Sequence, residues 1–393
     1  MGGYKQDRDL STHFQPVCTL PYYACHGGQM NHQNVQDNPA TSLEKLRELA
    51  DRDCLESPEM YRAALESVRE VLNKEDSLIQ LQDLPTIVIP DIHARRAMLI
   101  DILSHSIEEG PYQGQQVFEL LQKGLINVVC VGDIVHSEER ADWVINDNGD
   151  WTTELLDKEM IRSLGAALII MYLKVQYPEH FHCLRGNHDD MVGELAKDFR
   201  KFVGLKFENN ELVFLNGAPV ITASKGESMI VREWLLSRGD GWGQAFLELW
   251  GQFDRALPIL AKGTYYVISH TLPQRPLLAA DISNKHRPRE ITLQLTSKRG
   301  KNKQALDETL ENLGIKDTVK RWFYGHTHVA AETNGGRYEE DLDGLVVRMN
   351  NQKNYVFAYV PESRDNRLFD PTKDVYMKSP TEERFHNLKR KIG

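Results

Sequence analysis

Short apolar runs alternate with amphipathic stretches through most of the chain. The runs are unbroken, which predicts strands covered on both faces, because a half-exposed strand would alternate apolar and polar residues. Such strands are expected at 86–90, 127–131, 181–184, 263–269, 321–324, 345–349 and 355–359. Apolar residues at helical spacing over 98–107 and 155–175 place helices between the first three strands. This order predicts an α/β fold with helices on the faces of a sheet.

The regions outside these strands differ in composition. Residues 1 to about 40 show no periodicity, whereas 41–73 predict two helices interrupted near Ser57-Pro58. A stretch with three tryptophans, Trp234, Trp242 and Trp250, is expected to pack its aromatic rings into the core of an insertion. The expected divisions are an arm with a helical extension (1–80), a main body (81–365) containing a helical insertion (190–260), and a polar tail (366–393).

The charge of the chain narrows the classes of partner. The formal net charge of -10 over 393 residues argues against a general nucleic-acid coat, which needs a surplus of Lys and Arg. A basic run over 285–303 leaves a local patch for phosphorylated protein or nucleic acid open, although an exposed loop is the more common explanation. Nucleic acid is therefore not favoured as a partner.

The cysteines and the apolar stretches indicate the compartment. Five cysteines without a C-x-x-C pair fit reduced thiols in a cytoplasmic protein. No stretch approaches the roughly 18 apolar residues of a membrane span, and the N-terminus lacks a signal pattern. We expect a cytoplasmic protein without a membrane segment.

Five short polar segments follow apolar runs and supply metal-binding side chains. They are Asp91-Ile92-His93, Gly132-Asp133-Ile134-Val135-His136, Arg185-Gly186-Asn187-His188-Asp189, Ile268-Ser269-His270 and Gly325-His326-Thr327-His328. Carboxylate, imidazole and amide oxygen ligands without thiolate suit hard or borderline divalent cations. Asp133 is the natural bridging carboxylate, since two cations about 3.5–4 Å apart need a shared anion to offset their repulsion.

The order D-x-H, G-D-x-x-H, G-N-H-D, H and G-H-x-H over about 86–360 resembles the calcineurin-like metallophosphoesterase superfamily. The resemblance implies a β-sandwich of two mixed sheets flanked by helices, with the catalytic domain over 81–365. It also implies two metal positions. The first would be held by Asp91, His93, Asp133 and His328, and the second by Asp133, Asn187, His270 and His326.

The same resemblance implies roles in catalysis. His188 would be the acid–base histidine facing the leaving group, and His136 is the candidate to orient it. Arg185 stands two residues before Asn187, and its fork can grip two phosphate oxygens. Asn187 is also expected at the substrate. Arg140 is a second candidate for phosphate binding, with a solvated helix start as the alternative.

The substrate stays open because the signature is mixed. The segment around Arg185 resembles Ser/Thr protein phosphatases, whereas His136 and the second histidine of G-H-x-H resemble phosphodiesterases and nucleases. The leading hypothesis is a binuclear phosphatase that hydrolyses phosphomonoesters, from a phosphoprotein or a small phosphoester, with metal-activated hydroxide. A phosphodiesterase, dinucleoside polyphosphate hydrolase or nuclease is the alternative, and a non-catalytic scaffold the second. Mn, Fe, Zn and Ni all accept these ligands, and the oligomeric state is open.

Overall fold

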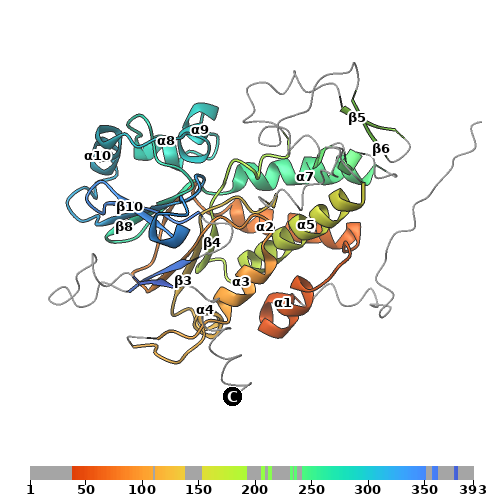
Figure 1. Cartoon of the computed structure of the whole chain (residues 1–393), viewed down its shortest axis with the longest axis horizontal. Coiled ribbons are helices and arrows are strands. Elements are labelled where there is room, and N and C mark those ends of the chain that lie inside the picture. Colours follow the sequence, from red (N-terminus) through yellow and green to blue (C-terminus); the bar gives the residue numbers. More distant parts are fainter. Residues whose placement is uncertain are drawn as a thin grey trace, which may run out of the picture.

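Two mixed β-sheets pack face to face at the centre of the molecule, and helices cover the outer face of each (Figure 1). This is the α/β sandwich expected from the sequence. The structure is a computed structural model, and it describes residues 38–108, 111–137, 153–192, 205–208, 211–214, 231–232, 234–236, 241–350, 356–361 and 376–378. Almost all of the predicted arm and most of the predicted tail lie outside these residues.

The first sheet has the strand order β13-β12-β2-β3-β4. Its strands are β2 (Thr86–Ile89), β3 (Asn127–Cys130), β4 (Phe181–Cys183), β12 (Phe357–Val360) and β13 (Tyr376–Lys378). β2, β3 and β4 are parallel, with Val88 opposite Val129 and Val129 opposite His182. β12 is antiparallel to both of its neighbours, β2 and β13. The three parallel strands therefore end at one edge of the sheet.

The second sheet has the order β1-β7-β8-β9-β11-β10. Its strands are β1 (Leu78–Gln80), β7 (Leu260–Lys262), β8 (Tyr266–Ser269), β9 (Arg321–Tyr324), β10 (Glu339–Asp341) and β11 (Val346–Arg348). β8, β9 and β11 are parallel neighbours. They bring the segments after β8 and β9 to one edge of this sheet.

Alternate residues of the central strands pack into different cores. In β2, Ile87 and Ile89 belong to the core under the first layer of helices, and Val88 belongs to the core between the sheets. In β9, Phe323 faces the core between the sheets, whereas Trp322 lies under the second layer of helices. Successive side chains of a strand point to opposite faces, so both faces are buried. This burial explains why the strands are unbroken apolar runs.

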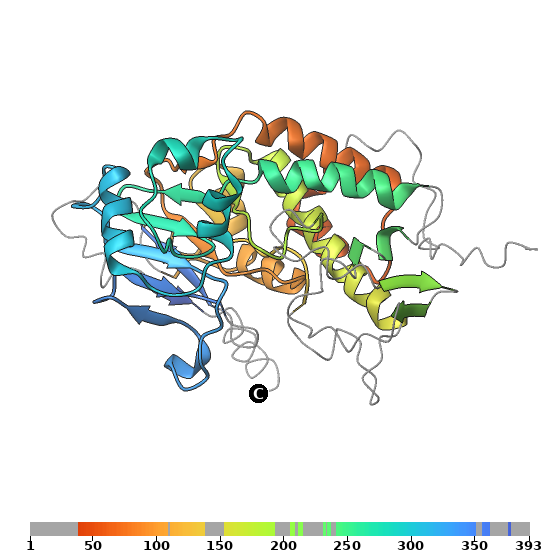
Figure 2. The same cartoon turned by 90° about the horizontal axis from the view of Figure 1, so that it is seen from above.

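Helices form the two outer layers (Figure 2). The first layer contains α1 (Leu43–Ala50), α2 (Pro58–Leu72), α3 (Arg96–Leu103), α4 (Val117–Gln122), α5 (Thr153–Gln176) and α7 (Trp242–Ala256), preceded by the 3₁₀ turn η2 (Pro39–Thr41). The second layer contains α8 (Ala279–Ser283), α9 (Arg289–Thr296) and α10 (Lys303–Asn312), and the turn η4 (Asn334–Gly336) precedes β10. Ser42 and Ser57 cap the two predicted N-terminal helices, which contact α3, α5 and α7. The helical extension is thus part of the first layer.

Two parts of the sequence interpretation need correction. The stretch predicted as a helical insertion contains α7 but also a hairpin of β5 (Leu205–Glu208) and β6 (Glu211–Phe214). The predicted polar tail contains β13, which pairs with the edge of β12. Pairing with a neighbouring strand, β5 with β6 and β13 with β12, defines these short strands. Trp234 and Trp250 are buried, as expected for the core of the insertion.

The cysteines also differ in part from expectation. Cys130 and Cys183 are free and buried in β3 and β4, whereas Cys54 is disulfide-bonded, against the expectation that every thiol is reduced. Cys54 is only half-buried after α1 and lacks the apolar strand context of the other two. Within the ranges that the structure describes, no helix combines the length and apolarity needed to cross a membrane.

Candidate metal centre

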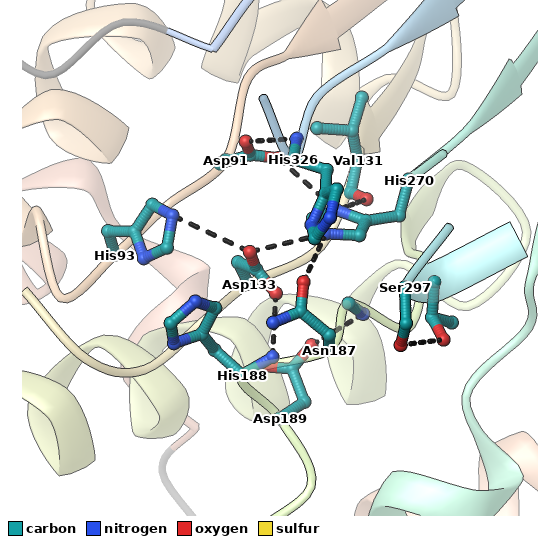
Figure 3. Close-up of polar contacts among 12 residues, drawn as sticks. Asp91, His93, Val131, Asp133, Asn187, His188, Asp189, His270, Ser297 and His326 are labelled. Carbon is teal, nitrogen blue, oxygen red and sulfur yellow. Dashed lines mark hydrogen bonds and ion pairs between the residues drawn. The ribbon is translucent and has the colours of Figure 1, made fainter. Parts of the chain in front are cut away.

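The predicted ligands lie where the parallel strands of the two sheets end. β2, β3 and β4 lead into the segments with Asp91, Asp133 and Asn187, and β8 and β9 lead into His270 and His326. Parallel strands present their carboxyl ends at one edge, which is where α/β sheets form binding sites. The two edges meet, so residues more than two hundred positions apart in sequence become neighbours (Figure 3).

Two groups of ligand atoms share one carboxylate. Asp91, His93 and Asp133 form one group, and Asp133, His270 and His326 form the other, with the candidate ligand atoms of each group within 4.8 Å of one another. Asp91, His93, Asp133 and His270 are at most 2% exposed. Asp133 is therefore common to both groups, which is where a bridging carboxylate would stand, and its role as a bridge stays a prediction.

The hydrogen bonds of two histidines turn the same ring nitrogen toward Asp133. His93 Nδ1 lies 2.8 Å from the carbonyl oxygen of His136, and His270 Nδ1 lies 3.1 Å from that of Val131. A carbonyl oxygen only accepts, so Nδ1 carries the proton in both rings. The Nε2 atoms of His93 and His270 lie 3.5 Å and 3.2 Å from Asp133 Oδ2. A backbone bond that fixes the tautomer in this way is the usual support of a metal-binding histidine.

Unusual backbone conformations concentrate at this site. Five residues other than glycine have positive φ here: His93 (43°), Ala94 (58°), Asp133 (48°), His136 (69°) and His326 (64°). Each such conformation costs on the order of 1–3 kcal/mol and persists only where the surroundings impose it. Three other described non-glycine residues with positive φ, Asn334, Leu342 and Asp343, lie outside the site, so most but not all of this strain falls in the loops that carry the candidate ligands.

Two motif glycines are required by close approach of a carboxylate. A Cβ atom on Gly186 would lie 2.1 Å from Asp133 Oδ1, and one on Gly325 would lie 1.9 Å from Asp91 Oδ1. No side chain fits at either position without displacing a candidate ligand. Steric exclusion of a side chain therefore explains why glycine stands at the first position of both G-N-H and G-H-x-H.

The electrostatics of the site favour a cation. Burial opposes the charged form of His270, yet the carboxylates of Asp133 and Asp91 raise its pKa well above the ordinary value. Burial also opposes the charge of Asp133, but the histidines around it, His270 first, hold its pKa well below the usual range. Burial and the neighbouring His270 lower the pKa of His326 to about 3, so its ring is neutral and able to act as a ligand.

The donor set fits two divalent cations. Among the described residues, Asp91 Oδ1 is buried and has no hydrogen-bond partner, although His270 Nδ1 lies 3.3 Å away. Asn187 Oδ1 lies 3.1 Å from His270 Nε2, so the predicted amide ligand also reaches the second group. His328 belongs to neither group, and its side chain is exposed. Its assignment as a ligand stays a prediction.

His188 is half-buried and lies beside the first ligand group. Its backbone N–H donates to Asp133 Oδ1 at 2.9 Å, which ties the loop after β4 to the bridging carboxylate. Its ring centroid is 5.0 Å from that of His93 and 5.7 Å from that of His136. His136 is 1% exposed, and burial holds its pKa well below the ordinary value, so it is neutral. The predicted neighbourhood of His136 and His188 is present, and their catalytic roles stay predictions.

Asp189 supports the site, a role that the sequence interpretation missed. Its Oδ1 accepts from the Ile134 N–H at 2.7 Å and its Oδ2 from the Gly186 N–H at 2.8 Å, which joins the loops after β3 and β4. Burial and the charge of Asp133 raise the pKa of Asp189 to about 6. The sequence signal for this role was the carboxylate directly after G-N-H, because a short acceptor side chain beside two turns can accept hydrogen bonds from their backbone N–H groups.

Arg185 lies elsewhere than its predicted role requires. Its Nε donates to Asp254 Oδ1 at 2.7 Å and its Nη2 donates to Asp254 Oδ2, and the two residues are 1% and 0% exposed. The guanidinium is thus used by a buried carboxylate of α7, so the interpretation as a phosphate clamp is replaced by that of a structural ion pair. Arg140 lies outside the described residues.

Comparison with known proteins agrees with the fold. Residues 84–330 match the family model described as calcineurin-like phosphoesterase. A protein serine/threonine phosphatase from Saccharomyces cerevisiae, with similarity to human phosphatase PP5, has a similar structure (TM-score 0.51, 13% identity, 86% of this chain and 95% of that chain covered). A cold-active protein tyrosine phosphatase of a Shewanella species also matches (TM-score 0.36, 12% identity, 74% of this chain and 79% of that chain covered). At such identities the likeness concerns the fold alone. No curated protein sequence matches significantly.

Proposed function

The chain belongs to the calcineurin-like phosphoesterase family of phosphoric ester hydrolases, and from this premise we propose that it hydrolyses phosphomonoesters at a binuclear metal centre. The observation that supports this most directly is the pair of ligand groups that share Asp133. Two bound cations would lower the pKa of a water molecule and neutralise phosphate oxygens. Mn, Fe, Zn and Ni are all compatible with these ligands.

The chain's own residues divide the remaining work. Asp91 and His93 would hold one cation, His270, His326 and Asn187 the other, and Asp133 both. His188 would donate a proton to the leaving oxygen, since its loop is anchored to Asp133 and its ring stands beside the ligand His93. The burial of Asp189 between two loop N–H groups would keep Asn187 and His188 in register with the site.

A second candidate is a phosphodiesterase, which includes nucleases and dinucleoside polyphosphate hydrolases. The observation in its favour is His136, a buried neutral histidine next to His188 at the position where the protein phosphatases have an aspartate. A phosphoprotein substrate, suggested by the segment around Arg185, has lost its main support because Arg185 is paired with Asp254. It remains one of the substrates to test.

The test is a substrate panel with metal analysis. We expect the purified protein to contain up to two transition-metal ions per chain and to hydrolyse p-nitrophenyl phosphate faster than its bis-ester, with loss of activity on chelation and recovery on metal addition. A phosphopeptide and a dinucleoside polyphosphate extend the panel. His188→Ala should lower kcat by about 10²–10⁴-fold. The matched control is His286→Ala, a histidine exposed beyond α8.

Each outcome decides between the candidates. Faster hydrolysis of the bis-ester would favour the phosphodiesterase over the phosphomonoesterase. Absence of both bound metal and turnover would rule out either enzyme and leave a scaffold. Equal activity of His188→Ala and His286→Ala would remove His188 from the mechanism.

A further inference from the structure

A second arginine, Arg299, reaches the metal centre from the loop after α9. Its Nε donates to Nε2 of His326 at 3.3 Å, and the side chain is exposed to solvent. His326 belongs to the second ligand group. Arg185, the arginine predicted from the sequence to bind phosphate, is buried against Asp254. Arg299, in contrast, contacts a candidate metal ligand directly.

The loop that carries Arg299 is held from both sides. Gly300 has φ of 121°, and its carbonyl oxygen accepts from Gln274 Nε2 at 2.8 Å. Lys301 Nζ donates to Glu339 at 2.8 Å and also to Asp341, both on β10. These contacts hold Gly300 and Lys301, the two residues that directly follow Arg299. Arg299 is therefore presented to the site by a supported loop.

Other members of the basic run 285–303 serve the fold. Lys285 donates to the Asn73 carbonyl at 2.5 Å, and Arg287 donates to Ser77 Oγ at 2.7 Å. Lys301 is paired with the acidic side chains of β10. The run is thus not one continuous surface for a phosphate backbone. Within it, Lys285, Arg287 and Lys301 contact the fold, whereas Arg299 contacts a candidate metal ligand.

The contact with His326 has a chemical consequence. A neutral imidazole has one nitrogen lone pair, and Arg299 donates to the nitrogen that carries it. A cation held by His326 in this tautomer would take the same lone pair. The guanidinium would then direct its donors to another acceptor beside His326, and a phosphate group bound at the centre supplies planar pairs of oxygens that match its fork.

We propose that Arg299 is the phosphate-binding residue of the metal centre, and that it exchanges His326 for phosphate when a cation occupies the second position. This inference rests on the proposed function. It implies that the binding of phosphate and the binding of metal are linked. Without phosphate, Arg299 opposes metal binding at His326. With phosphate bound, Arg299 supports metal binding at His326. Phosphate should therefore tighten metal binding, and by reciprocity the metal should tighten phosphate binding.

The experiment measures binding without turnover. Inorganic phosphate is titrated calorimetrically into the Mn²⁺-loaded full chain, and Mn²⁺ into the metal-free chain with and without phosphate. We expect Arg299→Ala to bind phosphate about ten- to a hundredfold more weakly, the loss typical of a hydrogen bond to a charged group. Arg299→Ala should bind Mn²⁺ at least as tightly as wild type without phosphate, and phosphate should tighten it less. Arg299→Lys should be intermediate, since it keeps the charge without the fork.

The matched control is Lys303→Ala, which removes the same charge from an exposed side chain of the same run. It should bind phosphate as wild type does. Unchanged phosphate affinity in Arg299→Ala, equal loss in Lys303→Ala, or no phosphate binding by the loaded wild type would each overturn the proposal. Phosphate binding that depends on Arg299 in a protein that hydrolyses no ester would instead support it and refute the proposed function.

Discussion

Two buried clusters of charged side chains lie within a few residues of each other and differ in how their charges are compensated. In the candidate metal centre, histidines supply the hydrogen-bond and ion-pair partners that the described residues offer to the carboxylates of Asp91 and Asp133, and Asp91 Oδ1 accepts no hydrogen bond from these residues. In the other cluster, Arg185 and Asp254 satisfy each other through two parallel hydrogen bonds. Arg185 and the candidate ligand Asn187 are separated by a single glycine, so the loop after β4 contributes to both.

A third cluster resembles the second, because its charged side chains pair with one another. Lys174 Nζ donates to Glu75 Oε1 at 2.6 Å, and His182 Nδ1 lies 2.6 Å from the same oxygen. Lys174 also donates to the Pro178 carbonyl at 2.8 Å, so helix α5, strand β4 and the end of α2 are tied together. All three side chains are at most 14% exposed.

The difference separates structural from functional charge. A buried ion pair that closes on itself offers nothing to a ligand, and breaking it leaves one charge without compensation. A buried cluster whose carboxylate and imidazole ligand atoms converge, as they do around Asp133, offers a place for a cation. The prediction that Arg185 binds phosphate failed because the local motif does not reveal which kind of cluster its side chain joins.

The largest expected effect is that of Asp133→Asn on the metal centre. Because both ligand groups include Asp133, the variant should lose most of its bound metal and at least about a thousandfold in kcat/KM, the several kcal/mol that a metal pair supplies. Metal analysis and p-nitrophenyl phosphate hydrolysis measure this. A variant that keeps two metals per chain would refute the bridging assignment.

An Asp→Asn change in the Arg185–Asp254 ion pair should affect the stability of the fold instead of the metal centre. Asp254→Asn leaves the buried Arg185 guanidinium without its countercharge, so the free energy of unfolding should fall by about 3–5 kcal/mol. Urea unfolding of the metal-free protein measures it. Glu248→Gln removes a charge from an exposed position of the same helix and should change stability by no more than about 0.5 kcal/mol. Equal effects of the two variants would contradict the assignment.

The third cluster should make stability depend on pH. Burial lowers the pKa of His182 although Glu75 opposes this, so between about pH 6.5 and the lower folded value the unfolded chain binds more protons. Stability is therefore lost as the pH falls below about 6.5, by at most about 1.4 kcal/mol per pH unit from this group. The variant His182→Gln should show a shallower slope in unfolding free energy from pH 7 to pH 5 in metal-free protein. Parallel slopes would show that His182 does not contribute.

The smallest effect is expected when both partners of the structural pair are replaced. Arg185→Met with Asp254→Leu removes both charges together, which is often neutral or stabilising. We expect recovery of most of the stability lost in Asp254→Asn, and kcat/KM close to that of wild type. Loss of activity in this stable double variant would restore the phosphate-clamp role of Arg185.

Much of the fold followed from local pattern. The strands β2, β3, β4, β8, β9, β11 and β12 were predicted because both of their faces are buried, so each is an apolar run that needs no partner to be recognised. Strands β1, β5, β6, β7, β10 and β13 were not predicted, and their length does not explain this, since the predicted strands β4 and β11 also have three residues. Pairing with a distant strand, such as β1 with β7, defines them.

The candidate site divides in the same way. The sequence by itself determined Asp91, His93, Asp133, Asn187, His270 and His326, because each directly follows a strand end and its turn, which are local features. Tertiary structure alone decided the partners of the arginines: Asp254 lies 69 residues from Arg185, and His326 lies 27 residues from Arg299. Motif spacing fixes where a side chain leaves the backbone, but a long charged side chain binds whichever countercharge packing brings within reach. Packing buried one arginine and left the other at the metal centre.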